Sequence, residues 1–166
     1  NATTAITGTA TLTTPYTCIT NGKITVSGVS GGNSPYTYSI DGITFQAGNT
    51  FSGLTNGNYT VTIKDTNNCT INTNSINIAP LNPPTDLSFS SSPLTCPTNV
   101  SNVTITETAG GVAALDSRIL SPAPAVTAYH SLPVFAGLVQ DPITFKVKDP
   151  MNCINSEPLP MVHLPA

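Results

Sequence analysis

Four cysteines are the residues of this 166-residue chain best suited to covalent chemistry. They are Cys18, Cys69, Cys96 and Cys153, and four cysteines allow three disulfide pairings. Zinc binding is the rival interpretation, but the sequence has no C-x-x-C pair and its two histidines have no ligand spacing. The cysteines therefore favour disulfides, which persist mainly outside the cytosol.

An internal repeat divides the chain into two copies of one module. Residues 51–69 align without a gap with residues 135–153, and eight of these nineteen positions are identical. Residues 24–32 (ITVSGVSGG) align in the same way with residues 103–111 (VTITETAGG). Tandem modules usually provide length or multivalency rather than a single active site.

The placement of the cysteines follows the repeat. Each copy has one cysteine before its first matched block and one at the end of its second block. This symmetry predicts one bond inside each copy, Cys18–Cys69 and Cys96–Cys153. A module of about 80 residues buries only roughly 60% of its unfolded surface and gains from such a link. In the chain-entropy model, loops of this length are worth roughly 4 kcal/mol.

The other residues with chemical potential have plainer interpretations. Asp65 and Asp149 occupy equivalent places after a strand, where a turn is favoured and calcium binding is the alternative. Tyr16, Tyr129 and His130 lie off the strand pattern and are the candidate ligand contacts. Neither His130 nor the second histidine, at position 163, has a Ser, Cys or carboxylate pattern nearby for nucleophilic catalysis. We therefore expect no enzyme activity and no cofactor other than the calcium alternative.

The elements that position these residues are predicted to be short antiparallel strands. Apolar and polar residues alternate over residues 24–27, 36–40 and 59–64, and again over 103–105 and 143–148. Period two with one apolar face is typical of half-buried strands. About seven strands per copy, with turns such as Asn-Gly and Asp-Gly between them, predict an all-β, immunoglobulin-like sandwich.

One local pattern refines this prediction. Leu54, Gly57 and Tyr59 form L-x-x-G-x-Y before the most regular strand. The pattern is typical of a tyrosine corner, in which the Tyr hydroxyl bonds to backbone a few residues upstream. In copy two the Tyr position holds Ile143, so that copy lacks the hydroxyl, and Pro142 is expected to stiffen the corner instead.

The boundary between the copies is rich in proline. Residues 80–84 hold three prolines, which favour an extended, semi-rigid connector. We expect modules of residues 1–82 and 83–166, arranged end to end.

The composition of the chain argues against some classes of function. Only 8% of residues are charged and the net charge is −3, which argues against nucleic-acid binding. The sequence has no apolar run near twenty residues, so no membrane insertion is expected. The first residues lack the features of a signal peptide. An exported protein without such a signal suggests a fragment of a longer array.

Copy one resembles a known family of repeats. Residues 31–39 read GGNSPYTYS, residues 54–61 read LTNGNYTV and residues 64–69 read KDTNNC. In this order and spacing they are similar to the SprB repeat of Bacteroidetes cell-surface proteins, over roughly residues 8–80. Copy two keeps the frame, but residues 112–116 read VAALD where copy one has PYTYS.

The resemblance implies a repeat of a large adhesin that the type IX system secretes and that gliding bacteria carry along the cell surface. We therefore expect a secreted stalk or surface-attachment segment of a bacterial adhesin, acting in gliding motility. Its partners would be neighbouring repeats and surface or substratum polysaccharide or protein. Two alternatives are ligand binding through the divergent insert, residues 120–134, and an accessory module of a secreted enzyme.

Overall fold

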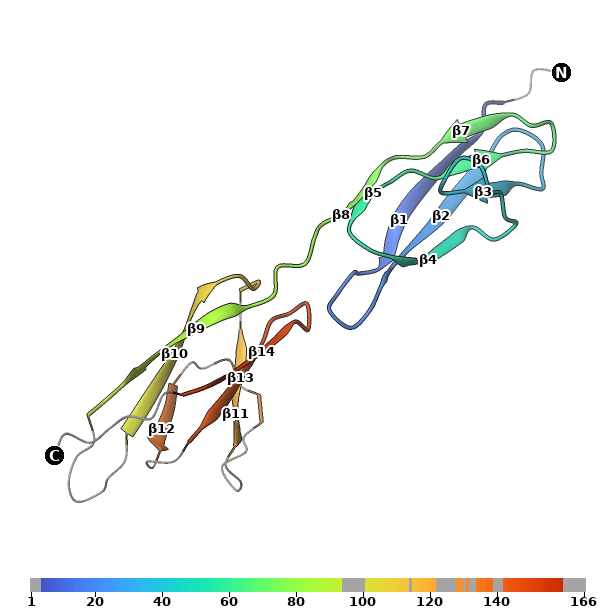
Figure 1. Cartoon of the computed structure of the whole chain (residues 1–166). Helices are drawn as coiled ribbons and strands as arrows, with labels where there is room; N and C mark the ends of the chain where they lie inside the picture. Colours follow the sequence, from blue (N-terminus) through green and yellow to red (C-terminus); the bar gives the residue numbers. More distant parts are fainter. Residues whose placement is uncertain are drawn as a thin grey trace. The chain divides into compact units, whose positions relative to one another are not determined.

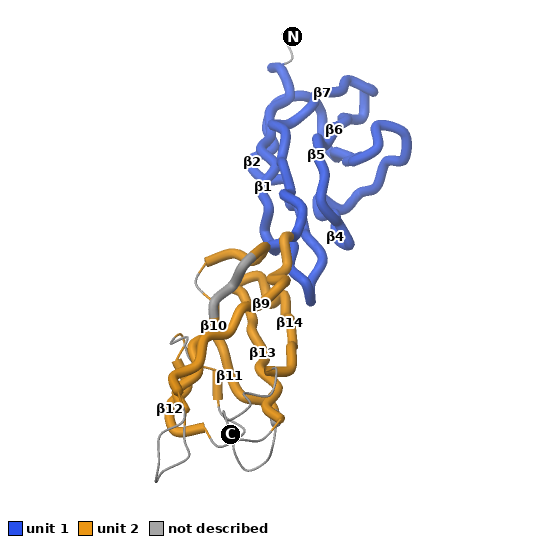
Figure 2. Tube along the Cα trace, turned by 60° about the vertical axis from the view of Figure 1, so that its left-hand side comes forward, with its two compact units in different colours: residues 1–81 blue, residues 82–166 orange. Residues whose placement is uncertain are grey.

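The computed structural model describes residues 4–93, 101–113, 115–121, 128–129, 131, 134–138 and 142–159. The chain divides into two compact units, Asn1–Leu81 and Asn82–Ala166 (Figure 2). The boundary lies one residue before the predicted one, inside the proline-rich connector. The two units therefore match the two copies of the sequence repeat.

Among its described residues, unit 1 has eight short strands in three antiparallel sheets (Figure 1). The first sheet has the order β1-β2-β4, the second β3-β6-β7, and the third pairs β5 with β8. The strands are β1 (Thr7–Thr14), β2 (Gly22–Ser30), β3 (Thr37–Ser39), β4 (Thr50–Leu54), β5 (Gly57–Tyr59), β6 (Thr62–Lys64), β7 (Thr70–Asn72) and β8 (Ile76–Ile78).

Unit 2 has six strands among its described residues, in two antiparallel sheets with the orders β12-β10-β9 and β11-β13-β14. They are β9 (Thr85–Ser91), β10 (Ser101–Ala109), β11 (Asp116–Ser121), β12 (Val134–Leu138), β13 (Thr144–Lys148) and β14 (Ile154–Pro158). The chain is thus all-β over its described part, as predicted, with one strand more than expected in unit 1 and one fewer in unit 2.

The two units share one sheet topology. Strands β9, β10 and β12 take the places of β1, β2 and β4, and β11, β13 and β14 take those of β3, β6 and β7. In unit 1 the sequence repeat covers most of β2 and β4 and all of β5 and β6, but none of β1, β3, β7 or β8, so the strand order extends the equivalence beyond the matched residues. The β5–β8 pair of unit 1 has no counterpart among the described residues of unit 2.

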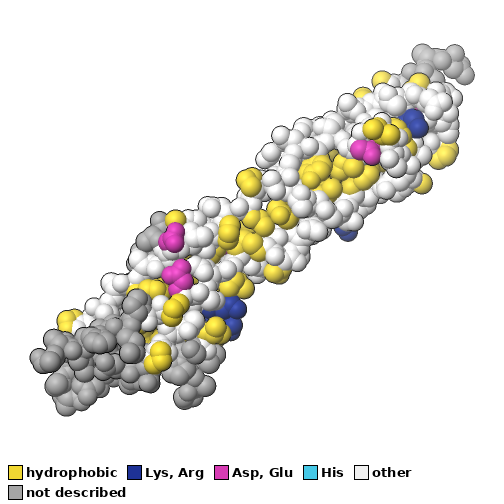
Figure 3. Space-filling model, viewed as in Figure 1, with side chains coloured by type: hydrophobic (Ala, Val, Ile, Leu, Met, Phe, Trp, Pro, Cys, Tyr) yellow, Lys and Arg dark blue, Asp and Glu magenta, His cyan; other side chains and the backbone are white. Residues whose placement is uncertain are grey.

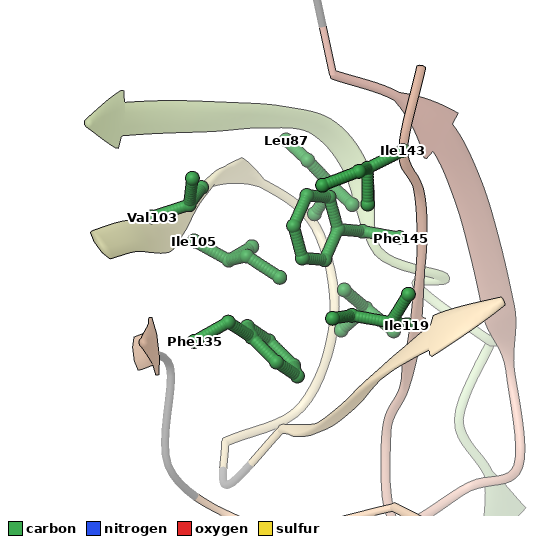
Figure 4. Close-up of a cluster of buried hydrophobic side chains, with 8 residues drawn as sticks. Leu87, Val103, Ile105, Ile119, Phe135, Ile143 and Phe145 are labelled. Atoms are coloured by element: carbon green, nitrogen blue, oxygen red, sulfur yellow. The ribbon is translucent and has the colours of Figure 1, made fainter. Parts of the chain in front are cut away.

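Each unit has its own apolar core, to which both of its main sheets contribute. In unit 1 the buried residues are Ile6, Ala10, Ile24, Val26, Tyr38, Val61 and Ile63. In unit 2 they are Leu87, Val103, Ile105, Ile119, Phe135, Ile143, Phe145 and Val147. Figure 4 shows the side chains of unit 2 pointing from facing strands toward the Phe145 ring. The predicted inward faces of the strands are confirmed.

Threonine hydroxyls line the outward face of the β1-β2-β4 sheet. On the β1-β2-β4 sheet the Thr25 hydroxyl lies 3.0 Å from the Thr13 hydroxyl and 3.4 Å from the Thr50 hydroxyl. Thr suits strands because its branched side chain fits the pleated surface, and here the hydroxyls also pair across strands. Figure 3 shows few charged side chains on the face in view, as the 8% charged content requires.

Candidate functional site

The hairpin turn that ends in the second cysteine of each copy is the best-defined polar feature of the fold. In unit 1 it joins β6 to β7. Oδ1 of Asp65 accepts hydrogen bonds from the backbone amides of Asn67 and Cys69, each at 2.9 Å. The Asp65 amide donates to the Cys69 carbonyl at 3.0 Å, and Asn68 has φ of 64°. Asn tolerates this left-handed conformation better than most residues.

Unit 2 repeats this turn between β13 and β14. The amide of Cys153 donates to Oδ1 of Asp149 at 2.9 Å, the Asp149 amide donates to the Cys153 carbonyl at 3.0 Å, and Asn152 has φ of 58°. These bonds confirm the predicted turn role for both aspartates. Over the described part of the chain, no three His, Cys, Asp or Glu side chains gather as metal ligands would.

The second carboxylate oxygen distinguishes the two turns. In unit 1, Oδ2 of Asp65 accepts the backbone amide of Asn33 at 3.1 Å, which ties the turn to the end of β2. In unit 2 the aligned position is Val112, and Oδ2 of Asp149, a residue only 1% exposed, has no hydrogen-bond partner among the described residues. A buried carboxylate oxygen without a partner is costly, so the unit 2 turn is the less well satisfied of the two.

The electrostatics of Asp65 follow from these contacts. Burial works to raise the pKa of the carboxyl, but the backbone amides of Asn33, Cys69 and Asn67 donate to its ionised form. The hydrogen bonds outweigh burial, so the pKa of Asp65 lies below its usual value. The turn is therefore held by a carboxylate that stays charged at neutral pH.

The predicted Cys18–Cys69 bond is wrong. Cys69 is a free, exposed thiol, whereas Cys18 is disulfide-bonded. Cys69 borders a cavity with Thr4, Ala5 and Ile6, just before β1 begins, and Cys18 lies in the loop after β1 ends. The eight residues of β1 separate the two by roughly 25 Å, and a disulfide needs Cα atoms within about 7 Å.

In unit 2, Cys153 is disulfide-bonded and 1% exposed. The second predicted bond, Cys96–Cys153, involves Cys96, which lies outside the described residues. The two turn cysteines thus sit in equivalent turns but differ in state, because one is free and exposed and the other is bonded and buried.

A cavity of about 110 Å³ opens beside Cys69. Its lining comes from the chain before β1, the end of β2 and the β6–β7 turn: Thr4, Ala5, Ile6, Gly32, Asn33, Asp65, Asn67 and Cys69. Gly32 has φ of 62°, and a Cβ there would lie 2.7 Å from the Ile6 side chain and 2.9 Å from Oδ2 of Asp65. The close packing of this wall therefore requires glycine.

The predicted tyrosine corner is present in unit 1. The Tyr59 hydroxyl donates to the Thr55 carbonyl at 3.0 Å, and Leu54 packs against the core. Gly57 has φ of 153°, and a Cβ there would touch the Tyr59 ring at 3.5 Å. In unit 2, Ile143 is buried in the core and contributes packing in place of the hydrogen bond.

Two of the candidate ligand contacts lie among the described residues, and neither is fully exposed. Tyr16 is half-buried in the loop between β1 and β2, and Tyr129 is also half-buried. The Tyr129 ring lies 4.6 Å from the Arg118 guanidinium and 4.8 Å from Nζ of Lys148, within cation–π range. His130 lies outside the described residues, as does most of the insert 120–134. The structure therefore assigns Tyr129 two cationic partners within unit 2.

Sequence reasoning missed two polar contacts in unit 1. The Ser39 hydroxyl donates to Oδ1 of Asp41 at 2.7 Å, and the amides of Ile43 and Thr44 donate to the same oxygen. These donors hold the pKa of Asp41 well below its usual range. In addition, the Tyr36 hydroxyl donates to the Gly31 carbonyl at 2.6 Å. The Asp41-Gly42 pair indicated a turn at the first of these contacts, but nothing in the local sequence indicated the bond from Tyr36 to Gly31.

No family model matches the sequence, and no curated protein matches it. Over the described residues there is no helix long and apolar enough to cross a membrane.

Proposed function

We propose that the chain is a repeat segment of a secreted bacterial cell-surface adhesin, made of two immunoglobulin-like β-sandwich modules that act as a stalk or surface-attachment segment. The observation that carries the proposal is the common strand order of the two units. Two sheets of the same order enclose a separate core in each unit. Repetition of a complete module favours reach or multivalency over a single active site.

Two further observations support an exported, surface-exposed protein. Cys18 and Cys153 are disulfide-bonded, and such bonds persist in oxidising compartments. The outer faces carry Thr and Ser hydroxyls that pair across strands. The resemblance of copy one to the SprB repeat suggests type IX secretion and a role in gliding motility.

A spacer exchange in the source bacterium tests this function. Residues 1–166 would be replaced in frame by two unrelated β-sandwich modules of similar size, and surface attachment and gliding would be scored. A stalk predicts that the unrelated modules restore both phenotypes, whereas deletion without replacement does not. Antibody labelling of intact cells, lost after external protease treatment, checks the surface location. Equal labelling of intact and lysed cells is the expected control result.

The second candidate function is ligand binding by unit 2 through residues 120–134. The specific observation in its favour is the pair of cations, Arg118 and Lys148, at the Tyr129 ring, since this insert is where the two copies differ most. Binding of the purified chain to polysaccharide, lost when the insert is shortened, would support this function. Restoration of attachment by the unrelated modules would exclude it.

A further inference from the structure

The two turn cysteines form a comparison within one molecule. Cys69 and Cys153 occupy equivalent positions, and in each turn the Cys amide donates to an aspartate Oδ1 at 2.9 Å. Yet Cys153 is disulfide-bonded and 1% exposed, and Cys69 is free and exposed. The same hydrogen bond holds the cysteine of each turn, but only the cysteine of the unit 2 turn is in a disulfide. The Cys69 turn therefore has the geometry of a disulfide site that has no partner bound.

We propose that Cys69 is a docking cysteine, whose thiol forms a disulfide with the loop cysteine, of the Cys18 type, from another copy of the module. This inference rests on the proposed function in one respect, namely that modules of this kind meet in an array. We name a loop cysteine as the partner because the cysteines of this chain that are disulfide-bonded are one of the loop type, Cys18, and one of the turn type, Cys153.

A partner within unit 1 is excluded by the fold. The loop cysteine and the turn cysteine lie at opposite ends of β1, whose eight residues span roughly 25 Å. Because a disulfide needs Cα atoms within about 7 Å, unit 1 presents one cysteine at each end and cannot join the two to each other. That arrangement suits links between modules rather than links within one.

The loop that carries Cys18 is shaped to present it. The Thr17 amide donates to the Thr20 carbonyl at 2.8 Å, the Thr20 amide donates to the Thr17 hydroxyl at 3.0 Å, and the Thr20 hydroxyl donates to the Pro15 carbonyl at 3.2 Å. These bonds close a turn with Cys18 and Ile19 at its tip, both exposed, and Ile19 is 69% exposed. All of these contacts lie within residues 14–23.

The surface at Cys69 has space for such a tip. The cavity beside the thiol measures about 110 Å³, several times the roughly 10–15 Å³ that one water molecule needs. Ala5 and Ile6 give the cavity an apolar side, and Asn33 and Asn67 give it a polar rim. An exposed Ile next to the incoming cysteine matches a cavity of this kind.

The bond forms by thiol–disulfide exchange with a small-molecule disulfide as the oxidant. The loop cysteine first exchanges into a mixed disulfide with one small thiol, and the other small thiol leaves. The Cys69 thiolate then attacks the loop sulfur, the mixed S–S bond breaks as the protein S–S bond forms, and the second small thiol leaves. Two protein thiols are oxidised and one small disulfide is reduced to two thiols.

The test uses the full chain as acceptor and a peptide of residues 14–23 as probe. The peptide cysteine is carried as a mixed disulfide with thionitrobenzoate, whose release is followed by absorbance. A scrambled peptide with the same activated cysteine is the matched probe. Cys69→Ser removes the acceptor thiol, and the thionitrobenzoate release that remains with this variant is subtracted as the contribution of other thiols. Cys69→Ser combined with Ser52→Cys moves the exposed thiol to β4 as the matched acceptor.

We expect Cys69 to react about tenfold faster with the loop peptide than with the scrambled peptide, which corresponds to about 1.4 kcal/mol of docking. The Ser52→Cys acceptor should show no preference. A preference at Cys69 below about threefold, or an equal preference at both acceptors, overturns the proposal. The spacer exchange measures attachment of cells, whereas this assay measures the reaction rate of one thiol. The docking proposal can therefore be refuted while the proposed stalk function stands, and the reverse also holds.

Discussion

Replacing Phe145 gives the sharpest test that unit 2 has its own core. The Phe145 ring is fully buried and lies 5.4 Å from the Phe89 ring and 5.1 Å from the Phe135 ring, between centroids. Phe→Ala at a buried site costs about 3–5 kcal/mol, and the loss of two aromatic contacts places this site in the upper part of that range. We therefore expect Phe145→Ala to cost unit 2 about 4–5 kcal/mol.

That loss is large for a unit of this size. At roughly 0.05–0.15 kcal/mol per residue, a domain of about 85 residues is stable by roughly 4–13 kcal/mol. Phe145→Ala should therefore remove between about a third and all of the stability of unit 2. Phe145→Leu keeps an apolar side chain and should cost roughly 1–2 kcal/mol, within the usual range for a core substitution. Leu120→Ala, at an exposed position of β11, is the matched control and should change little.

Hydrogen exchange read by mass spectrometry separates the two units, because peptides from β10 and β13 report unit 2 and peptides from β2 and β6 report unit 1. We expect faster exchange in the unit 2 peptides of Phe145→Leu, by about tenfold per 1.4 kcal/mol, and unchanged exchange in unit 1. An equal loss of protection in both units would show that they unfold together. A cost below about 1 kcal/mol for Phe145→Ala would refute the core assignment.

Three further predictions concern the tyrosine corner, the Asp65 turn and the two turn cysteines. Tyr59→Phe should cost about 1 kcal/mol in urea unfolding, since it removes the bond to the Thr55 carbonyl, and a neutral result would contradict the corner. Because the folded pKa of Asp65 is lowered, its contribution to stability is full above the unfolded pKa, near 4, and is lost as the pH falls through the folded value. Asp65→Asn should therefore weaken the loss of unit 1 stability as the pH falls below about 4 in thermal melts, and an unchanged slope would assign that loss to other groups. Maleimide should label Cys69 in the folded, unreduced chain and reach Cys153 only after reduction and unfolding, as mass spectrometry of peptides can check.

The divergence of the two copies follows the contacts that each retains. Unit 1 keeps the Tyr59 hydroxyl bond and the Asn33 amide at Oδ2 of Asp65. Unit 2 fills the first position with buried Ile143, whereas Val112 at the aligned second position is exposed and Oδ2 of Asp149 has no partner among the described residues. At the corner, copy two thus has apolar packing in place of a hydrogen bond, and its core contains three phenylalanine rings in contact.

Several features of this protein were determined by the sequence alone, since each depends on interactions close in the chain. The repeat together with the proline-rich connector placed the unit boundary within one residue, and period-two alternation identified the buried face of β2, β6, β10 and β13. The tyrosine corner and the aspartate turns use bonds that span four residues, from Tyr59 to Thr55 and from Cys69 to Asp65. Local chemistry suffices to predict contacts of this range.

The cysteine pairing and the contacts across the module were decided only by the tertiary structure. Symmetric placement of Cys18 and Cys69 suggested a bond, but the topology of β1 puts them at opposite ends of unit 1. The bond from the Asn33 amide to Asp65 spans 32 residues, and it exists because the end of β2 and the β6–β7 turn meet at the same end of the module. A pattern in the sequence gives the face of a strand on which a residue lies, whereas the end at which it lies depends on how the strands are ordered in space.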